Sequence, residues 1–466
     1  MSKEQELFDE SINLIKNYLF DKSHKKIRSQ NSFEELKTDL GNITPEFPNQ
    51  NEIILEAIQK YIQTSVKTKD ERYMQSLWGG NHITAILGEV LVASTNTSMY
   101  TFDTAPSATV IEKSIISKLL QLIGWQEGDG VFTSGGSNGN LLGLLCARNY
   151  SYPEYSKIGN RNRRFQIFIS KESHYSVENA ARIIGIGTEN IIEINCNHDG
   201  EMDPEDLEKK IQESIQSSFT PFCVVATAGT TVRGCFDPID KIANICKKFD
   251  IWLHLDAAWG GAVLFSEKHR MLLEGIERTN SICFDPHKLM GLPLICSTFL
   301  VNNPQQLREI SSCVKDPSYL FHGEDTKFDL GKISLACGRR ADAIKLWLTW
   351  LSIGTKGWGE RVDYCIELAK YLENLVVKHP QLELMSSRKF TNVCFRWRPK
   401  HTSNKEEINN LNFKLRQKLV AKGNFMISSA QLGDTQILRP VIAHTTIQKS
   451  TLNELIIEIE KIAKKL

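Results

Sequence analysis

Apolar residues recur at helical spacing in two stretches near the start of the chain. In the first, residues 4–20, Leu7, Ile12 and Ile15 fall near one side of a helix, with acidic and lysine residues between them. Residues 51–66 show the same spacing. We predict two amphipathic helices, whose apolar faces need a partner in the main body or in a second subunit.

From about residue 79, short apolar runs alternate with helix-compatible stretches. The runs that we expect to form strands are residues 130–133, 166–170, 191–196, 222–227, 252–257, 281–284 and 298–301. Buried strands that alternate with helices indicate a mostly parallel α/β sheet covered on both faces. Sheets of this kind bind ligands in the loops beyond the carboxyl ends of their strands.

Beyond about residue 347 the pattern predicts a smaller α+β unit. Residues 345–352 and 362–378 are helix-like, and residues 392–397 are strand-like. The last helix starts with Thr451 and Glu454 at the spacing of a capping box. No internal repeat is evident.

The patterning therefore predicts three parts of the chain. Residues 1–75 form a helical arm, residues 76–346 a large ligand-binding domain and residues 347–466 a small C-terminal domain. A chain of 466 residues is long enough to bury a large core and to hold more than one such part.

Composition narrows the class of protein. Hydrophobic residues make up 41% and charged residues 24% of the chain, as in ordinary globular proteins. The formal net charge is +1, so no overall field favours nucleic acid or an anionic membrane. We therefore expect neither as a partner.

Cysteine usage and the N-terminus indicate a cytoplasmic protein. The eleven cysteines are scattered singly without a C-x-x-C pair, which predicts free thiols in a reducing compartment and no metal site. Four of the first ten residues are acidic, unlike a signal peptide. No apolar run approaches the ~18 residues that a membrane span requires.

A Gly/Ser-rich loop follows the predicted strand at residues 130–133. In this loop, Ser134 to Asn140, small residues let backbone N–H groups close around an anion, and the following helix adds positive potential. Neither a P-loop nor a G-x-G-x-x-G pattern is present. The loop indicates a single phosphate group or, alternatively, only a tight turn.

Other predicted strands end in residues that could carry chemistry. Lys288 follows a strand and an Asp-Pro-His turn, where desolvation can make a lysine amine nucleophilic. Asp256 ends a hydrophobic strand and could pair with a protonated ring nitrogen, and His174 could stack on an aromatic ring. Thr231 follows a further strand and could reach a polar ring substituent. Taken singly, each residue also has a structural explanation.

Together these stretches resemble the group II pyridoxal-phosphate-dependent amino acid decarboxylases, nearest to the glutamate, cysteine sulfinate and aspartate branch. The resemblance runs from about residue 72 to the C-terminus. It is carried by NTSMYTFDTAP (96–106), FTSGGSNGN (132–140), Asp-Ala-Ala (256–258), DPHK (285–288), SYLF (318–321), CGRR (337–340) and ILRPVI (437–442). The resemblance implies an aminotransferase type I-like fold and pyridoxal 5'-phosphate as cofactor.

The resemblance also implies roles for the residues at the strand ends. Lys288 would form the Schiff base with the cofactor, and Asp256 would hold the ring nitrogen protonated. His174 would stack on the ring face opposite Ala258, and Thr231 would lie near the ring hydroxyl. The phosphate would be held by Gly136, Ser137 and His287.

Two further matches concern the substrate and the subunit partner. Arg439 matches the arginine that grips the substrate α-carboxylate, and a guanidinium fork suits this task. Tyr319 matches a loop tyrosine that protonates Cα after decarboxylation. In the family this loop covers the active site of the neighbouring subunit, which implies a homodimer with its active sites at the subunit interface.

The choice of substrate depends on Ser76, Trp78, Ser98 and Tyr100. Ser76 stands where glutamate-type enzymes carry a glutamine, while Ser98 and Tyr100 look like the cysteine sulfinate type. The bulky Trp78 should shorten the pocket, so we expect aspartate or cysteine sulfinate, giving β-alanine or hypotaurine and CO2. Alternatives are glutamate, 2,4-diaminobutyrate or an aromatic amino acid, a different reaction on the same cofactor, and an inactive structural subunit.

Overall fold

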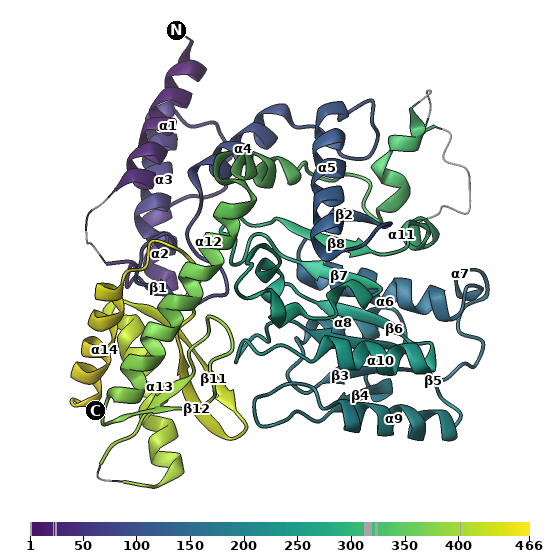
Figure 1. The fold of residues 1–466 in the computed structure, drawn as a ribbon. Helices are drawn as coiled ribbons and strands as arrows, with labels where there is room; N and C mark the ends of the chain where they lie inside the picture. The colour runs from purple at the N-terminus through teal and green to yellow at the C-terminus, as the bar shows by residue number, and fades with distance from the viewer. Residues whose placement is uncertain (1, 22, 24–25, 312–318, 322–324, 401) are drawn as a thin grey trace. The chain divides into compact units, whose positions relative to one another are not determined.

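A computed structural model of the protein describes all residues except 1, 22, 24–25, 312–318, 322–324 and 401 (Figure 1). The chain divides into two compact units. The larger unit contains Leu77–Phe395 and Val441–Thr445; the smaller contains Met1–Ser76, Arg396–Pro440 and Thr446–Leu466. These units divide the chain differently from the three predicted parts, whose bounds stay a prediction.

A seven-stranded sheet forms the centre of the larger unit, in the order β2-β8-β7-β6-β5-β3-β4. Its strands are β2 (Asp129–Thr133), β3 (Phe165–Ser170), β4 (Ile191–Ile194), β5 (Thr220–Thr227), β6 (Trp252–Asp256), β7 (Ser281–Phe284) and β8 (Ser297–Val301). Only β8 runs against its neighbours β7 and β2. The prediction of a mostly parallel sheet is confirmed, and the reversed direction of β8 is new.

The larger unit also contains helices, several of which pack on this sheet (Figure 1). They are α4 (Ile83–Thr95), α5 (Pro106–Ile123), α6 (Gly136–Ser151), α7 (Tyr155–Ile158), α8 (Ser176–Ile183), α9 (Pro204–Gln216), α10 (Ile239–Phe249), α11 (Pro304–Ser311) and α12 (Ala343–Lys378). Helix α6 packs against β5, β6, β7 and β8, while α9 and α10 pack against β4, β5 and β6. Helix α12 is broken at Gly354, where φ is 67°. The short strand β9 (Leu382–Leu384) also belongs to this unit.

The smaller unit contains both ends of the chain. Its helices are α1 (Lys3–Phe20), α2 (Phe33–Leu40), α3 (Asn51–Thr64), α13 (Lys405–Lys422) and α14 (Lys449–Ala463), and its strands include β1 (Tyr73–Met74), β11 (Met426–Leu432) and β12 (Thr435–Arg439). Strand β10 (Phe395–Trp397) crosses the boundary between the units along the chain. Strand β11 pairs parallel with β1 and antiparallel with β12. Helices α1 and α3 confirm the two predicted amphipathic helices.

Among the described helices, none combines the length and the apolarity that a membrane crossing requires.

Candidate active site

A cavity of about 260 Å³ lies at the carboxyl ends of the parallel strands. Its lining comes from the segments that follow β2, β3, β5, β6 and β7, together with Trp78 and Leu294. The lining residues are Trp78, Gly136, Ser137, Asn140, His174, Thr227, Gly229, Thr231, Asp256, Ala258, Trp259, Asp285, His287, Lys288 and Leu294. Parallel strands bring these segments together because all of them end at the same edge of the sheet.

Asp256 is the last residue of β6, and its carboxylate is held at both oxygens. Oδ1 accepts a hydrogen bond of 3.1 Å from the backbone N–H of Ala258. Oδ2 accepts one of 2.8 Å from Nδ2 of Asn140 in α6. Only 6% of Asp256 is exposed, so these two donors offset part of the cost of burying the carboxylate. The carboxylate is therefore fixed in one rotation at the edge of the cavity.

Lys288 forms an ion pair with Asp285, a residue that the sequence analysis left without a role. Nζ of Lys288 lies 3.3 Å from Oδ2 of Asp285. Burial alone would lower the pKa of Lys288, but the negative charges of Asp285 and Asp256 outweigh burial and raise it. These carboxylates therefore favour the charged form of the amine.

His287 lies beside the same carboxylate. Its Nε2 is 3.7 Å from Oδ2 of Asp285, and its Nδ1 lies 2.7 Å from the carbonyl oxygen of Cys296. The backbone N–H of Cys296 also points at this nitrogen, at 3.3 Å, so the backbone of Cys296 holds the ring of His287 in place. Burial lowers the pKa of His287 below its usual value, against the charge of Asp285.

The Gly/Ser loop leads directly into α6, which begins at Gly136. Gly135 has a φ of 127°, a backbone conformation that residues other than glycine rarely adopt. A Cβ atom at Gly136 would lie 2.7 Å from Oδ2 of Asp285 and 3.2 Å from Cβ of Ala258. Glycine at these positions brings the first N–H groups of α6 against the cavity, where a helix start favours an anion.

His174 lines the cavity from the segment after β3. Its Nδ1 lies 2.8 Å from the hydroxyl of Ser176, the first residue of α8. The backbone N–H of Ser176 also points at this nitrogen, at 3.3 Å, so Nδ1 accepts and the proton of the neutral ring sits on Nε2. Burial lowers the pKa of His174, although the negative charge of Asp256 acts in the opposite direction.

Nine of the residues predicted for the site line this single cavity, and five do not. The nine are Trp78, Gly136, Ser137, His174, Thr231, Asp256, Ala258, His287 and Lys288. Ser76 and Arg439 belong to the smaller unit: Ser76 lies 2.8 Å from the hydroxyl of Tyr73, and Arg439 donates from Nε to Ser428.

The other three predicted residues belong to the larger unit but do not line the cavity. The ring of Tyr100 stacks on Phe321 at 5.2 Å between centroids. The carbonyl of Ser98 accepts a hydrogen bond from Thr104. The side chain of Tyr319 is 78% exposed. Of the motif SYLF, Ser318 lies outside the described residues.

Six residues that line the cavity were not predicted as site residues: Asn140, Thr227, Gly229, Trp259, Asp285 and Leu294. Asn140 and Asp285 stand inside motifs that the sequence analysis quoted, but neither was assigned a role. Thr227 was treated only as part of a strand end. Its Oγ1 and the Oδ1 of Asp285 are buried and find no hydrogen-bond partner among the described residues. An occupant of the cavity would satisfy both atoms.

Comparison with known families identifies the family of this chain. The sequence model described as "Pyridoxal-dependent decarboxylase conserved domain" matches residues 34–398. The chain belongs to this family. It is a pyridoxal-phosphate-dependent amino acid decarboxylase, and pyridoxal 5'-phosphate is its cofactor.

Individual relatives agree with this membership. "Acidic amino acid decarboxylase GADL1" from Bos taurus is 34% identical over 92% of this chain and 85% of the relative, and that from Mus musculus is 35% identical over 88% and 77%. Among solved structures, mouse CSAD matches the decarboxylase with a TM-score of 0.96 and 33% identity, covering 99% of both chains. These similarities confirm the aminotransferase type I-like fold.

A solved structure of Oryza sativa TDC with PLP and tryptamine shares the fold at a TM-score of 0.92, with 22% identity over 99% of this chain and 98% of that one.

The residues of the cavity fit the cofactor of the decarboxylase. The cavity is lined by the amine of Lys288, the fixed carboxylate of Asp256 and the start of α6. It also contains two buried oxygen atoms without a hydrogen-bond partner among the described residues, Oγ1 of Thr227 and Oδ1 of Asp285. These are the kinds of group that an aldehyde, a ring nitrogen, a phosphate and a ring substituent require. The flat ring also needs a small neighbour, and Ala258 supplies one.

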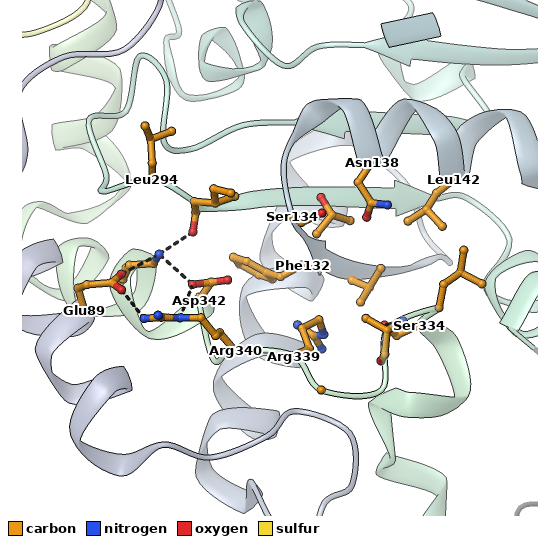
Figure 2. Close-up of a pocket in the computed structure, with 17 residues that line it drawn as sticks. Glu89, Phe132, Ser134, Asn138, Leu142, Leu294, Ser334, Arg339, Arg340 and Asp342 are labelled. Carbon is orange, nitrogen blue, oxygen red and sulfur yellow. Dashed lines mark hydrogen bonds and ion pairs between the residues drawn. The ribbon is translucent and has the colours of Figure 1, made fainter. Parts of the chain in front are cut away.

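A second, larger cavity of about 560 Å³ shares Leu294 with the first (Figure 2). At one end of it Lys345 donates to the carbonyl oxygen of Ile295 at 2.5 Å and pairs with Asp342 at 2.9 Å and Glu89 at 3.0 Å. In Figure 2, Glu89 and Asp342 lie on one side of the cavity, where dashed lines mark ion pairs. The cluster thereby anchors the segment that leads to Cys296, the partner of His287.

Proposed function

We propose that the decarboxylase removes the α-carboxylate of aspartate or cysteine sulfinate, giving β-alanine or hypotaurine. The observation that carries this proposal is Trp78, whose side chain lines the cavity together with Lys288 and Asp256. A bulky indole leaves less room for the second side-chain methylene of glutamate. Similarity to "Acidic amino acid decarboxylase GADL1" supports an acidic substrate.

Within the cavity, the proposed roles follow the chemistry of each side chain. Pyridoxal phosphate supplies an electron-accepting ring that stabilises the charge left on Cα when CO2 departs. Lys288 would hold the cofactor covalently, and Asp256 would hold a proton on the ring nitrogen. His174 and Ala258 would contact the two faces of the ring.

The remaining contacts would position the cofactor. Gly136, Ser137 and the imidazole of His287 would hold the phosphate, since a helix start and a ring N–H donate hydrogen bonds to anions. Thr231 would donate to the ring hydroxyl oxygen. Asp285 would act as counter-ion to the amine of Lys288, because the two side chains form an ion pair.

Two residues outside the cavity lining complete the proposal. The guanidinium of Arg439 would grip both oxygens of the α-carboxylate and so select the bond that breaks. The phenol of Tyr319 would deliver a proton to Cα, which yields the amine. Ser76, Ser98 and Tyr100 remain candidates for contacts to the substrate side chain.

We also propose that the enzyme is a homodimer with its active sites at the subunit interface. Helix α4 packs with Gly88 against the backbone of Lys345, where a Cβ would lie 2.7 Å from the lysine Cα. Its other face carries four apolar side chains that are 44–54% exposed: Ile83, Leu87, Val90 and Leu91. An apolar face of this size needs a partner, and a second copy would cover it.

A substrate panel tests the proposed function. Purified protein with added pyridoxal phosphate is given aspartate, cysteine sulfinate, glutamate, 2,4-diaminobutyrate or tyrosine, and CO2 release is measured. We expect kcat/KM for aspartate or cysteine sulfinate to exceed that for glutamate by about tenfold or more. This is the discrimination that one extra methylene in a pocket usually produces. Glutamate as the best substrate would overturn the proposed specificity, and turnover of tyrosine alone would overturn the acidic class.

A further inference from the structure

We propose that His254 is a positioning residue of the decarboxylase. It fixes the orientation of the Asn140 amide, and this amide in turn fixes the Asp256 carboxylate and the His174 ring. The proposal rests on the proposed role of Asp256 at the ring nitrogen of the cofactor. His254 itself does not line the cavity.

The local structure brings these groups together in a simple way. Trp252, His254 and Asp256 alternate along β6, so their side chains share one face of the sheet. Helix α6 packs on this face, and Gly143 lets it approach closely. A Cβ at Gly143 would lie only 2.6 Å from Nδ1 and Cε1 of His254. One turn earlier in α6, Asn140 therefore reaches both His254 and Asp256.

The direction of the hydrogen bonds begins at Trp252, whose Nε1–H can only donate. It donates to Oγ of Ser281 at 2.9 Å. The hydroxyl proton of Ser281 is then available for Nδ1 of His254, 2.8 Å away. The Asp256 carboxylate, which only accepts, takes Nδ2 of Asn140 and leaves Oδ1 to face Nε2 of His254, so the neutral imidazole carries its proton on Nε2 and Nδ1 accepts.

The same direction continues through Asn140. Nε2 of His254 donates to Oδ1 of Asn140 at 3.0 Å. The amide nitrogen of Asn140 then has two protons, one for Oδ2 of Asp256 and one for Oγ of Ser176, both at 2.8 Å. The hydroxyl of Ser176 can then donate to Nδ1 of His174. Every donor in this series of hydrogen bonds meets one acceptor.

The reverse arrangement fails at two places. If Asn140 turned its amide over, its NH2 group would face the N–H of His254, and its carbonyl oxygen would face the carboxylate of Asp256. Both contacts are repulsive, so the protonated Nε2 of His254 locks the amide. Burial lowers the pKa of His254 to about 4, which keeps the ring neutral around pH 7.

The first test uses the cofactor-free protein and does not depend on the proposed function. Nitrogen-15-labelled histidine side chains are observed by NMR at pH 7, and the His254 signals are assigned by their loss in His254→Gln. We expect a neutral ring with the proton on Nε2. A proton on Nδ1, or a charged ring, would overturn the proposed direction of the hydrogen bonds.

The second test compares His254→Gln with His254→Leu, which are similar in size. The amide of glutamine can still donate to Oδ1 of Asn140, while leucine cannot. With cofactor labelled by nitrogen-15 in its ring, we expect the glutamine variant to keep the wild-type shift of the ring nitrogen. The leucine variant should move this shift toward the unprotonated form and raise the Kd of the cofactor about tenfold.

Wild-type shift and affinity in both variants would reduce His254 to a purely structural residue and overturn the proposal. If the wild-type protein bound no pyridoxal phosphate, the proposed site would fail instead. The tautomer of His254 in the cofactor-free protein distinguishes the two failures.

Discussion

Nδ2 of Asn140 donates a hydrogen bond of 2.8 Å to Oδ2 of Asp256, from the second turn of α6 to the last residue of β6. Asn140 is 1% exposed, so no solvent competes for this bond. The contact connects the Gly/Ser loop at the start of α6, which is proposed to hold the phosphate, with the carboxylate proposed for the ring nitrogen. One amide therefore couples two parts of the proposed cofactor site.

Removing this amide should weaken cofactor binding. In Asn140→Ala the carboxylate of Asp256 loses one of its two donors, and a hydrogen bond to a charged group is worth about 1.5–3 kcal/mol, or roughly 10- to 150-fold in Kd. Titration of cofactor-free protein with pyridoxal phosphate measures the change. Asn149→Ala, at a buried asparagine of the same helix outside the cavity lining, is the control. Equal Kd values in the two variants would contradict the coupling.

Cofactor loading should depend on pH through Lys288. Burial lowers the pKa of this amine, but Asp285 and Asp256 raise it by more, so the amine is charged at neutral pH and only its small neutral fraction attacks an aldehyde. The loading rate should therefore rise with pH from 6 to 9. Asp285→Asn removes the nearest negative charge, which lowers the pKa, speeds loading at pH 7 and moves the profile to lower pH.

Stopped-flow absorbance of cofactor-free protein mixed with pyridoxal phosphate measures this profile. Asp329→Asn is a matched control, because Asp329 pairs with Lys332 at the same sequence spacing but outside the cavity lining. An Asp285→Asn profile that coincides with wild type would show that this ion pair does not set the pKa of Lys288.

His254 should make the fold sensitive to acid. Its pKa is about 4 in the folded protein and about 6.5 in the unfolded chain, so only the unfolded chain binds a proton between these values. The free energy of unfolding therefore falls as the pH drops through this window, by roughly 3 kcal/mol from this residue alone. His254→Gln should lose less stability than wild type between pH 6.5 and 4.5.

Urea unfolding at several pH values within this window gives the difference. His198→Gln, which replaces an exposed histidine, should follow the wild-type curve. Identical pH slopes for His254→Gln and wild type would mean that burial does not depress the pKa of His254.

Trp78 should limit the length of the substrate. Trp78→Ala opens space beside Lys288, so the ratio of kcat/KM for glutamate to that for aspartate should rise by about 10- to 100-fold, as expected for accommodating one methylene. Trp78→Phe keeps most of the bulk and should stay near wild type. A ratio that does not move in Trp78→Ala would assign substrate choice to other residues.

The sequence identified the ends of the strands well, because parallel strands place their carboxyl ends at one edge. Asp256 ends one strand, His174, Gly136 and Lys288 follow three others, and all four residues line one cavity. The reversed strand β8 was not predicted, since periodicity defines the faces of a strand but not its direction.

The role of Asn140 was not foreseen for a different reason: it depends on how closely α6 approaches β6. Gly139 and Gly143, four residues apart on this helix, were the available indication of that close approach. Asp285 was overlooked because its ion pair arises from the turn after β7. Tyr100 and Ser98 are the opposite case. They were predicted as site residues because their motif resembles that of the family, but they do not line the cavity.

The most direct test of the account locates the cofactor on the chain. Protein loaded with pyridoxal phosphate is reduced with borohydride, digested and mapped by mass spectrometry. We expect the cofactor to be attached to the peptide containing Lys288, and we expect Lys288→Ala to carry no label. Attachment to another lysine, such as the buried Lys345, or a labelled Lys288→Ala protein, would contradict it.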